Sequence, residues 1–132
     1  MKHFPEIRSY NLKPGTRDEF HRLFLFLEQG FPMLRRWNVD VVAYGPSLHD
    51  GDSCFLMRRF DSLVQREQSE NAFYSSPEWR QGPREAILAL IENYNEIVLE
   101  VDDVTLQGFA GFRIEVKPTG RLPVGFCPVV AG

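Results

Sequence analysis

The feature that most limits the fold of this chain is the order of its strand-like and helix-like patterns. Strand patterns of alternating or β-branched residues cover residues 4–12, 39–47, 53–60 and 96–101. Helical patterns cover residues 16–29 and 62–74, and shorter helical pieces follow each of them. The order is β-α-β-β-α-β, which predicts an α+β protein with the ferredoxin-like arrangement: a four-stranded antiparallel sheet with its helices on one face.

The change from strand to helix is abrupt at two places, and each has a local cause. Pro14-Gly15 interrupts the first strand pattern, and Thr16–Glu19 reads T-R-D-E, a capping box that predicts a helix start. Ser62–Gln65 reads S-L-V-Q and predicts the second start in the same way.

The region after residue 82 contains the last predicted elements. A helical stripe is expected over residues 86–94, because the apolar positions Ala86, Ile87, Leu90, Ile91 and Tyr94 follow helical spacing. We therefore expect one domain over residues 1–101. Residues 102–132 are rich in Gly and Pro and contain one strand-like stretch at 112–117, so we expect a C-terminal extension that packs on the sheet or on a partner.

Composition and charge exclude several classes of protein. The chain has 132 residues and a net charge of −3, without a run of Lys or Arg, so a nucleic acid is not an expected partner. No segment has the roughly 20 apolar residues of a membrane helix, and the N-terminus does not resemble a signal peptide, which favours a cytoplasmic protein without a membrane partner. Cys54 and Cys127 fit no metal-ligand spacing and are expected to be reduced, buried thiols.

Several short stretches resemble one known family, and they occur together. They are Glu6-Ile7-Arg8-Ser9-Tyr10, Leu12-Lys13-Pro14-Gly15, Asp61-Ser62-Leu63, Arg66-Glu67, Ala72-Phe73-Tyr74 and Ser76-Pro77-Glu78-Trp79. On these residues the chain resembles the NIPSNAP family of the dimeric α+β barrel superfamily. The resemblance implies a ferredoxin-like protomer whose sheet packs against a second copy. It implies no agreed reaction, although the wider superfamily includes cofactor-independent monooxygenases, isomerases and haem enzymes.

Charged residues inside the predicted strands require partners. Arg8, Arg58 and Arg59 fall within strands, and a charge in a sheet must be paired or must face a wet cavity. Glu67 and Glu70 lie along one line of the second helix and can supply those partners. A structural Arg–Glu network is one interpretation. The other is that one arginine stays free to bind an acidic or carbonyl-bearing ligand.

Candidate binding residues are a set of rings and one arginine that could line a common pocket: Tyr10, His21, Trp37, Tyr44, Arg59 and Trp79. Each ring also has an ordinary interpretation, as a core or interface anchor or, for His21, as a half-exposed helix residue. His3 and His49 are given no role. The three histidines have no metal-site spacing, no nucleotide or hydrolase motif occurs, and no metal, cofactor or catalytic residue is assigned.

Two functions from different classes follow. The first is a small cofactor-independent oxygenase or isomerase that acts on a planar or carbonyl compound. The second is a non-catalytic dimer that binds a small apolar ligand or a protein. A homodimer is expected in both cases, because both sheet faces carry apolar residues: strand two is predicted to place Val41 and Ala43 on one face and Val42 and Tyr44 on the other.

Overall fold

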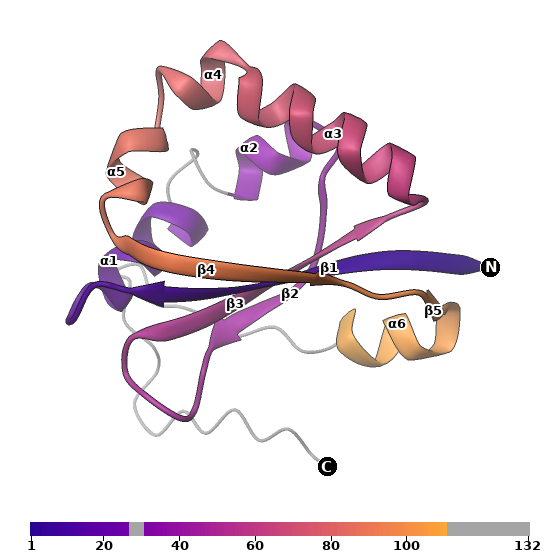
Figure 1. Ribbon diagram of the computed structural model, residues 1–132, viewed down its shortest axis with the longest axis horizontal. Helices are drawn as coiled ribbons and strands as arrows, with labels where there is room; N and C mark the ends of the chain where they lie inside the picture. Colours follow the sequence, from indigo (N-terminus) through magenta and orange to yellow (C-terminus); the bar gives the residue numbers. More distant parts are fainter. Residues whose placement is uncertain (27–30, 111–132) are drawn as a thin grey trace.

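The computed structural model describes residues 1–26 and 31–110. Its strands are β1 (Lys2–Leu12), β2 (Asp40–Pro46), β3 (Ser53–Phe60), β4 (Ile91–Val98) and the short β5 (Val101–Asp102). The sheet order is β2-β3-β1-β4, every neighbouring pair is antiparallel, and β5 pairs with the start of β1 (Figure 1). This arrangement confirms the predicted ferredoxin-like α+β fold.

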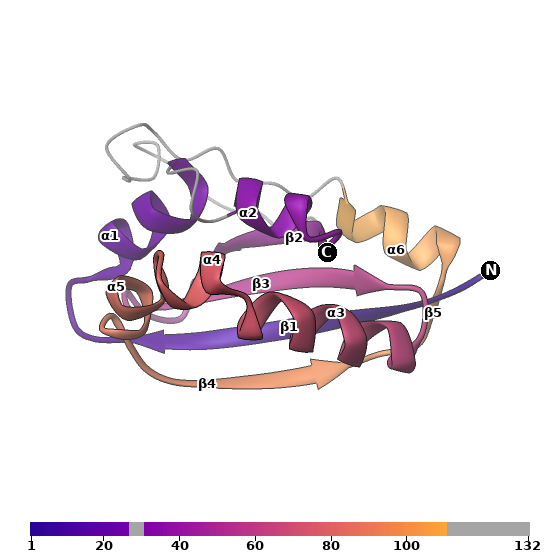
Figure 2. The same cartoon turned by 90° about the horizontal axis from the view of Figure 1, so that it is seen from above.

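The described helices are α1 (Arg17–His21), its continuation as the π-helical turn η1 (Arg22–Phe26), α2 (Phe31–Arg36), α3 (Leu63–Ser75), α4 (Pro77–Arg80), α5 (Arg84–Leu88) and α6 (Asp103–Ala110). Helices α2 to α5 lie over one face of the sheet, and α6 lies against the opposite face (Figures 1 and 2). The first part of the predicted Gly/Pro-rich extension is therefore a helix that packs on the sheet. The strand-like stretch at 112–117 is outside the described residues.

The two predicted capping boxes turn out differently. At the start of α1, the Thr16 side chain caps no amide. Its hydroxyl donates to the Lys13 carbonyl at 2.7 Å, because Thr16 still belongs to the turn that follows β1. At α3, the Ser62 hydroxyl accepts from the Gln65 amide at 3.0 Å, but the Gln65 side chain reaches the Asp61 amide and not that of Ser62. The predicted reciprocal box is wrong at Thr16 and half formed at Ser62.

The helical stripe predicted over residues 86–94 is wrong in its second half. Helix α5 ends at Leu88, whereas Ile91 and Tyr94 belong to β4. Tyr94 pairs with Tyr10 of β1 in the sheet, so backbone pairing with the central strand overrides the helical spacing. Strand β4 therefore begins five positions before the predicted start at residue 96.

A β-bulge in β2 decides which residues face the helices. The pairing of β2 with β3 slips between Val41 and Ala43. As a result Val41 packs with the core under α1 to α5, together with Tyr44, while Val42 and Ala43 both face α6. The predicted strict alternation of strand two is therefore wrong, since the extra residue shifts the faces by one position.

The two sheet faces are covered to different extents. The helix-side face forms the main core, with Leu12, Leu56, Phe60 and Phe73 among its buried residues. On the other face, Leu106 of α6 packs on Val42, Ala43 and Met57. Farther along this second face, Ile97 is 56% exposed. None of the described helices is long and apolar enough to cross a lipid bilayer.

Candidate functional site

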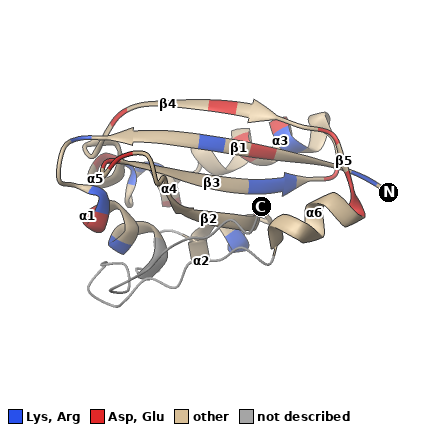
Figure 3. Ribbon diagram, turned by 90° about the horizontal axis from the view of Figure 1, so that it is seen from below, with Lys and Arg blue, Asp and Glu red and all other residues tan. Residues whose placement is uncertain are grey.

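A cluster of buried charges joins the sheet to α3, and Glu6 is its centre. The Glu6 carboxylate is fully buried and accepts from Arg8 Nε at 2.9 Å, from Arg66 Nε at 2.7 Å and from the Arg58 guanidinium. Figure 3 shows that these opposite charges come from β1, β3 and α3. A carboxylate without solvent is tolerated here because three guanidinium groups surround it.

The strand arginines have further partners in the same cluster. Arg8 lies 3.5 Å from Glu70 and 3.2 Å from Glu96, and Arg58 lies 3.6 Å from Glu70. The structure thus places Glu70 against both arginines and leaves neither of them free for a ligand. Glu67 is exposed and has no ion pair among the described residues.

Two members of this cluster, Glu6 and Glu96, were missed in the sequence. A signal for Glu6 was present, because residues two apart in a strand share a face and Glu6 therefore lies beside Arg8. Glu96 stands directly opposite Arg8 in the pairing of β1 with β4. The sequence could not supply that contact, because the register of the two strands was unknown.

The neighbouring carboxyl groups of Glu6 and Glu70 have pKa values shifted in opposite directions. Burial alone would raise the pKa of Glu6, but the hydrogen bond from Glu70 and the charge of Arg58 hold that pKa below its ordinary value. Burial, followed by the hydrogen bond to Glu6, raises the pKa of Glu70 to about 7. Glu70 is therefore the member of the pair that carries the proton near neutral pH.

These carboxylates are a poor site for a cation. One oxygen from each of Glu6, Glu70 and Glu96 lies within 4.8 Å of the others. Arginine N–H groups already approach all three, however, and their positive charge opposes a metal ion at the same place. We assign no metal to this cluster.

A cleft of about 470 Å³ opens beside the cluster, between the sheet and helices α3 to α5. Its described lining consists of Arg8, Tyr10, Phe24, Asn71, Tyr74, Ser75, Trp79, Arg80, Arg84, Ile87, Leu88, Ile91 and Tyr94. The volume lies within the range of pockets that bind small organic ligands. Rings and aliphatic side chains supply its apolar surface, and three arginines are among its polar groups.

The inner end of the cleft combines a guanidinium with phenols. The Arg8 guanidinium lies 5.3 Å from the ring centre of Tyr74 and 5.0 Å from that of Tyr94. The Tyr74 oxygen accepts from Arg8 at 3.2 Å and from Arg58 at 2.8 Å. Burial raises the pKa of Tyr10, so this phenol stays neutral at physiological pH.

The Tyr74 hydroxyl is oriented by its two donors. Because both guanidinium groups donate to the oxygen, its own proton is directed to another acceptor. The hydrogen bonds of residues 1–26 and 31–110 include no such acceptor. This end of the cleft can therefore donate a hydrogen bond to an oxygen atom of a ligand.

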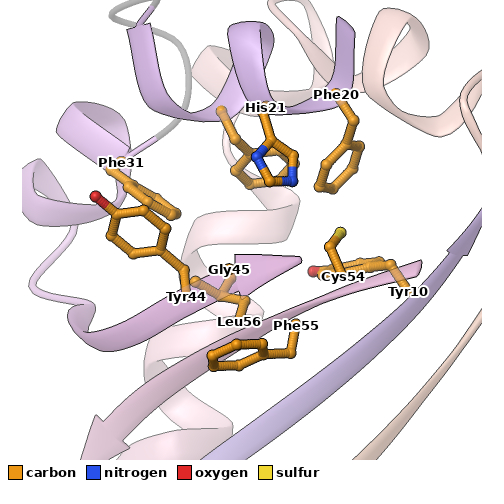
Figure 4. Close-up of a pocket in the computed structure, with 10 residues that line it drawn as sticks. Tyr10, Phe20, His21, Phe31, Tyr44, Gly45, Cys54, Phe55 and Leu56 are labelled. Carbon is orange, nitrogen blue, oxygen red and sulfur yellow. The ribbon is translucent and has the colours of Figure 1, made fainter. Parts of the chain in front are cut away.

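A second, much smaller pocket lies under α1, and Figure 4 shows its lining. It holds about 20 Å³ and is bordered by Tyr10, His21, Tyr44 and Cys54, with Phe24 shared between it and the cleft. Such a space admits about one water molecule and excludes an organic ligand. The pocket is therefore part of the core rather than a ligand site.

His21 is buried in this small pocket, not half-exposed as the ordinary interpretation of the sequence had it. Its Nδ1 has no hydrogen-bond partner among the described residues. Burial lowers the pKa of His21 to about 4, and the charge of Arg17 acts in the same direction. The imidazole is therefore neutral at physiological pH.

The six predicted binding residues do not form one site. Tyr10 and Trp79 line the cleft, whereas His21 and Tyr44 line the small pocket, which Tyr10 also borders. The Trp37 indole donates to Glu78 at 2.8 Å, away from both. Arg59 lines a separate hollow beside α6, where its guanidinium lies 3.1 Å from Asp40. Tyr74, Arg80 and Arg84, which the sequence analysis did not select, belong to the cleft.

A family model and similar solved structures indicate one family for this chain. The NIPSNAP family model matches residues 5–102. A NIPSNAP family protein from Agrobacterium tumefaciens is similar in structure, with a TM-score of 0.66 and 20% identity over 76% of this chain and 94% of that one. An uncharacterized NIPSNAP domain protein from Burkholderia xenovorans has a TM-score of 0.65 and 15% identity over 76% and 95% of the two chains. A comparison with curated proteins finds no match.

Proposed function

This chain belongs to the NIPSNAP family, and we propose that it binds a small planar compound with a carbonyl or acidic oxygen in the cleft between the sheet and α3 to α5. One observation carries the proposal: a ring-lined cleft of about 470 Å³ is bordered by Tyr74, whose hydroxyl two arginines orient. Family membership supports the fold that positions this cleft and leaves the ligand open.

The walls of the cleft suit a flat ligand. Tyr94 is 47% exposed although it lies on the helix side of the sheet, and the exposed Leu88 faces the same opening. Trp79 and Ile87 form the buried part of the wall. A planar ligand would remove apolar surface of Tyr94 and Leu88 from water, which supplies the affinity, while the hydroxyl of Tyr74 fixes its orientation.

A thermal-shift screen over carbonyl and phenolic compounds tests the proposal. A bound compound raises the melting temperature of the wild-type protein, and Tyr94→Ala should lose most of this rise because one wall of the cleft is removed. Asn95→Ala is the matched control, since Asn95 is the next residue of β4 and points away from the cleft. Equal ligand effects in both variants would contradict binding at this place.

A second candidate, a cofactor-independent oxygenase or isomerase, is favoured by the hydroxyl of Tyr74. A proton donor held by two guanidinium groups can stabilise negative charge that develops on a carbonyl oxygen. Among its described residues, however, the cleft lining includes no carboxylate and no imidazole that could remove a proton. Simple ligand binding is therefore the function that the geometry supports best.

Two measurements separate catalysis from binding. Deuterium exchange next to the carbonyl of a bound ketone, followed by NMR, reports isomerase chemistry, and oxygen uptake reports oxygenase chemistry. Tyr74→Phe should abolish either activity, because the donor is removed while the ring remains. A ligand that binds without exchange and without oxygen uptake supports the non-catalytic function.

We also propose that the protein is a homodimer that joins two copies through the sheet face on which α6 lies. Ile97 is exposed on that face beside the half-buried Ile7, and Phe55 is half-buried on the same side. A twofold contact covers this patch on both chains with one surface. The alternative to a dimer is that residues 111–132 of the same chain, which follow α6, cover this patch.

Light scattering at micromolar concentration measures the mass of the wild-type protein and of Ile97→Asp. A dimer that becomes a monomer in Ile97→Asp supports the proposal, because a buried carboxylate without a partner is costly at an apolar interface. Val64→Asp, on the exposed side of α3, is the control and should remain a dimer. A monomeric wild-type chain would refute the proposed dimer.

A further inference from the structure

The cleft is positively charged, although the protein as a whole carries a net charge of −3. Among the described residues that line it are Arg8, Arg80 and Arg84, and none is Asp or Glu. A cleft with charge of one sign concentrates ligands of the opposite sign. The three arginines differ, however, in whether they are available to a ligand.

Arg8 is not available, because its guanidinium is already paired with Glu6, Glu70 and Glu96. Arg80 and Arg84 are exposed and form no ion pair among the described residues. The acidic residue nearest in sequence to Arg80, Glu78, is occupied by hydrogen bonds from Arg36 and from the Trp37 indole. The positive charge of the cleft therefore comes from Arg80 and Arg84.

A tight turn places these two arginines on the same opening. Arg80 ends α4 and Arg84 begins α5, and only three residues separate them. Gly82 lies in this turn, where an added Cβ would come within 2.4 Å of the Glu78 carbonyl oxygen, so the turn requires a glycine. The backbone thus brings two uncompensated guanidinium groups to the opening of the ring-lined cleft.

We infer that the ligand of the cleft is an amphipathic carboxylate, with its acidic group on Arg80 and Arg84 and its apolar body against Trp79, Leu88 and Tyr94. This inference rests on the proposed function and adds the chemical class of the ligand. A carboxylate accepts hydrogen bonds from guanidinium groups with favourable geometry. A second oxygen at the far end of the ligand would meet the hydroxyl of Tyr74.

Two probes of the same shape test the inference by calorimetry: 2-naphthoate, which carries the charge, and 2-acetylnaphthalene, which is neutral. The proteins are the wild type, the double variant Arg80→Gln/Arg84→Gln and the control Arg35→Gln. Arg35 is exposed on α2 and lies outside the cleft lining, so its loss changes the net charge without changing the site.

The expected result is that the wild type binds 2-naphthoate about tenfold more tightly than 2-acetylnaphthalene, a difference of about 1.4 kcal/mol. The double variant should lose this preference, and Arg35→Gln should keep it. Equal binding of the two probes by the wild type, or a preference that survives in the double variant, overturns the inference and leaves the proposed binding function standing. Failure of both probes to bind at about 1 mM overturns the binding function and the inference together.

Discussion

Replacing Glu6 with glutamine tests the central contact of the buried charge cluster. Glu6 is fully buried and receives hydrogen bonds from Arg8, Arg58 and Arg66. Glutamine keeps the shape of the side chain but removes the negative charge and one of the two acceptor oxygens. Three guanidinium groups then share only Glu70 and Glu96 as acidic partners.

The size of the effect follows from the burial of this contact. Breaking a buried ion pair on one side costs about 3–5 kcal/mol, whereas an exposed pair contributes less than about 1 kcal/mol. Arg58 is almost fully buried and cannot turn its charge to water, so we expect Glu6→Gln to lower the free energy of unfolding by about 3–5 kcal/mol. That loss is a large share of the 5–15 kcal/mol that typically stabilises a domain.

Urea unfolding at pH 7, followed by circular dichroism, measures this change. The control is Glu67→Gln, because Glu67 is exposed on α3 and forms no ion pair among the described residues. It should shift the free energy of unfolding by less than about 0.5 kcal/mol. A loss below about 1 kcal/mol in Glu6→Gln would refute the reasoning, since it would mean that water screens the cluster.

Three further predictions concern single side chains. The pKa of Glu70 is about 7 in the folded protein, whereas its ordinary value is 4.5, so the folded state holds an extra proton between these two pH values. The free energy of unfolding should therefore fall by on the order of 2 kcal/mol as the pH rises through this window. Urea titrations at pH 5 and pH 8 should show this fall in the wild type and not in Glu70→Gln. Burial raises the pKa of Cys54 to about 12, so iodoacetamide should alkylate this thiol slowly in the native protein and fast in urea. Mass spectrometry of the peptide that contains Cys54 measures the two rates, and equal rates would show that the thiol is accessible in the native protein. Leu106→Ala should lower the free energy of unfolding by about 2–3 kcal/mol, because the methyl groups that pack on Met57 are lost, and an unchanged value would mean that α6 contributes nothing to stability.

The sequence by itself determined the order of the elements and hence the fold. Residues 53–60 form a strand with the predicted bounds, since apolar residues including Phe55 and Phe60 suit a buried strand and turn residues precede them. The start of α3 also followed from local chemistry, because Ser62 caps its own helix without any distant contact. Patterns of this kind are readable because all the atoms involved lie within a few residues of one another.

Tertiary structure decided which side chains meet. Ile91 and Tyr94 have helical spacing with Leu90 and Ile87, yet they belong to β4, because pairing with β1 satisfies their backbone groups. The bulge at Val42 reversed the faces that strict alternation had assigned, and nothing in the local sequence marks it.

The candidate site was the least predictable part for the same reason. The cleft is lined by Arg8 from the first strand, Tyr74 from α3 and Arg84 from α5. The distances between these residues depend on strand register and on the turn at Gly82. The sequence could show that buried arginines need acidic partners. Only the folded chain decided that Arg8 and Arg58 form ion pairs with Glu70 while Arg80 and Arg84 face the cleft, because pairing is set by contacts between residues far apart in the chain.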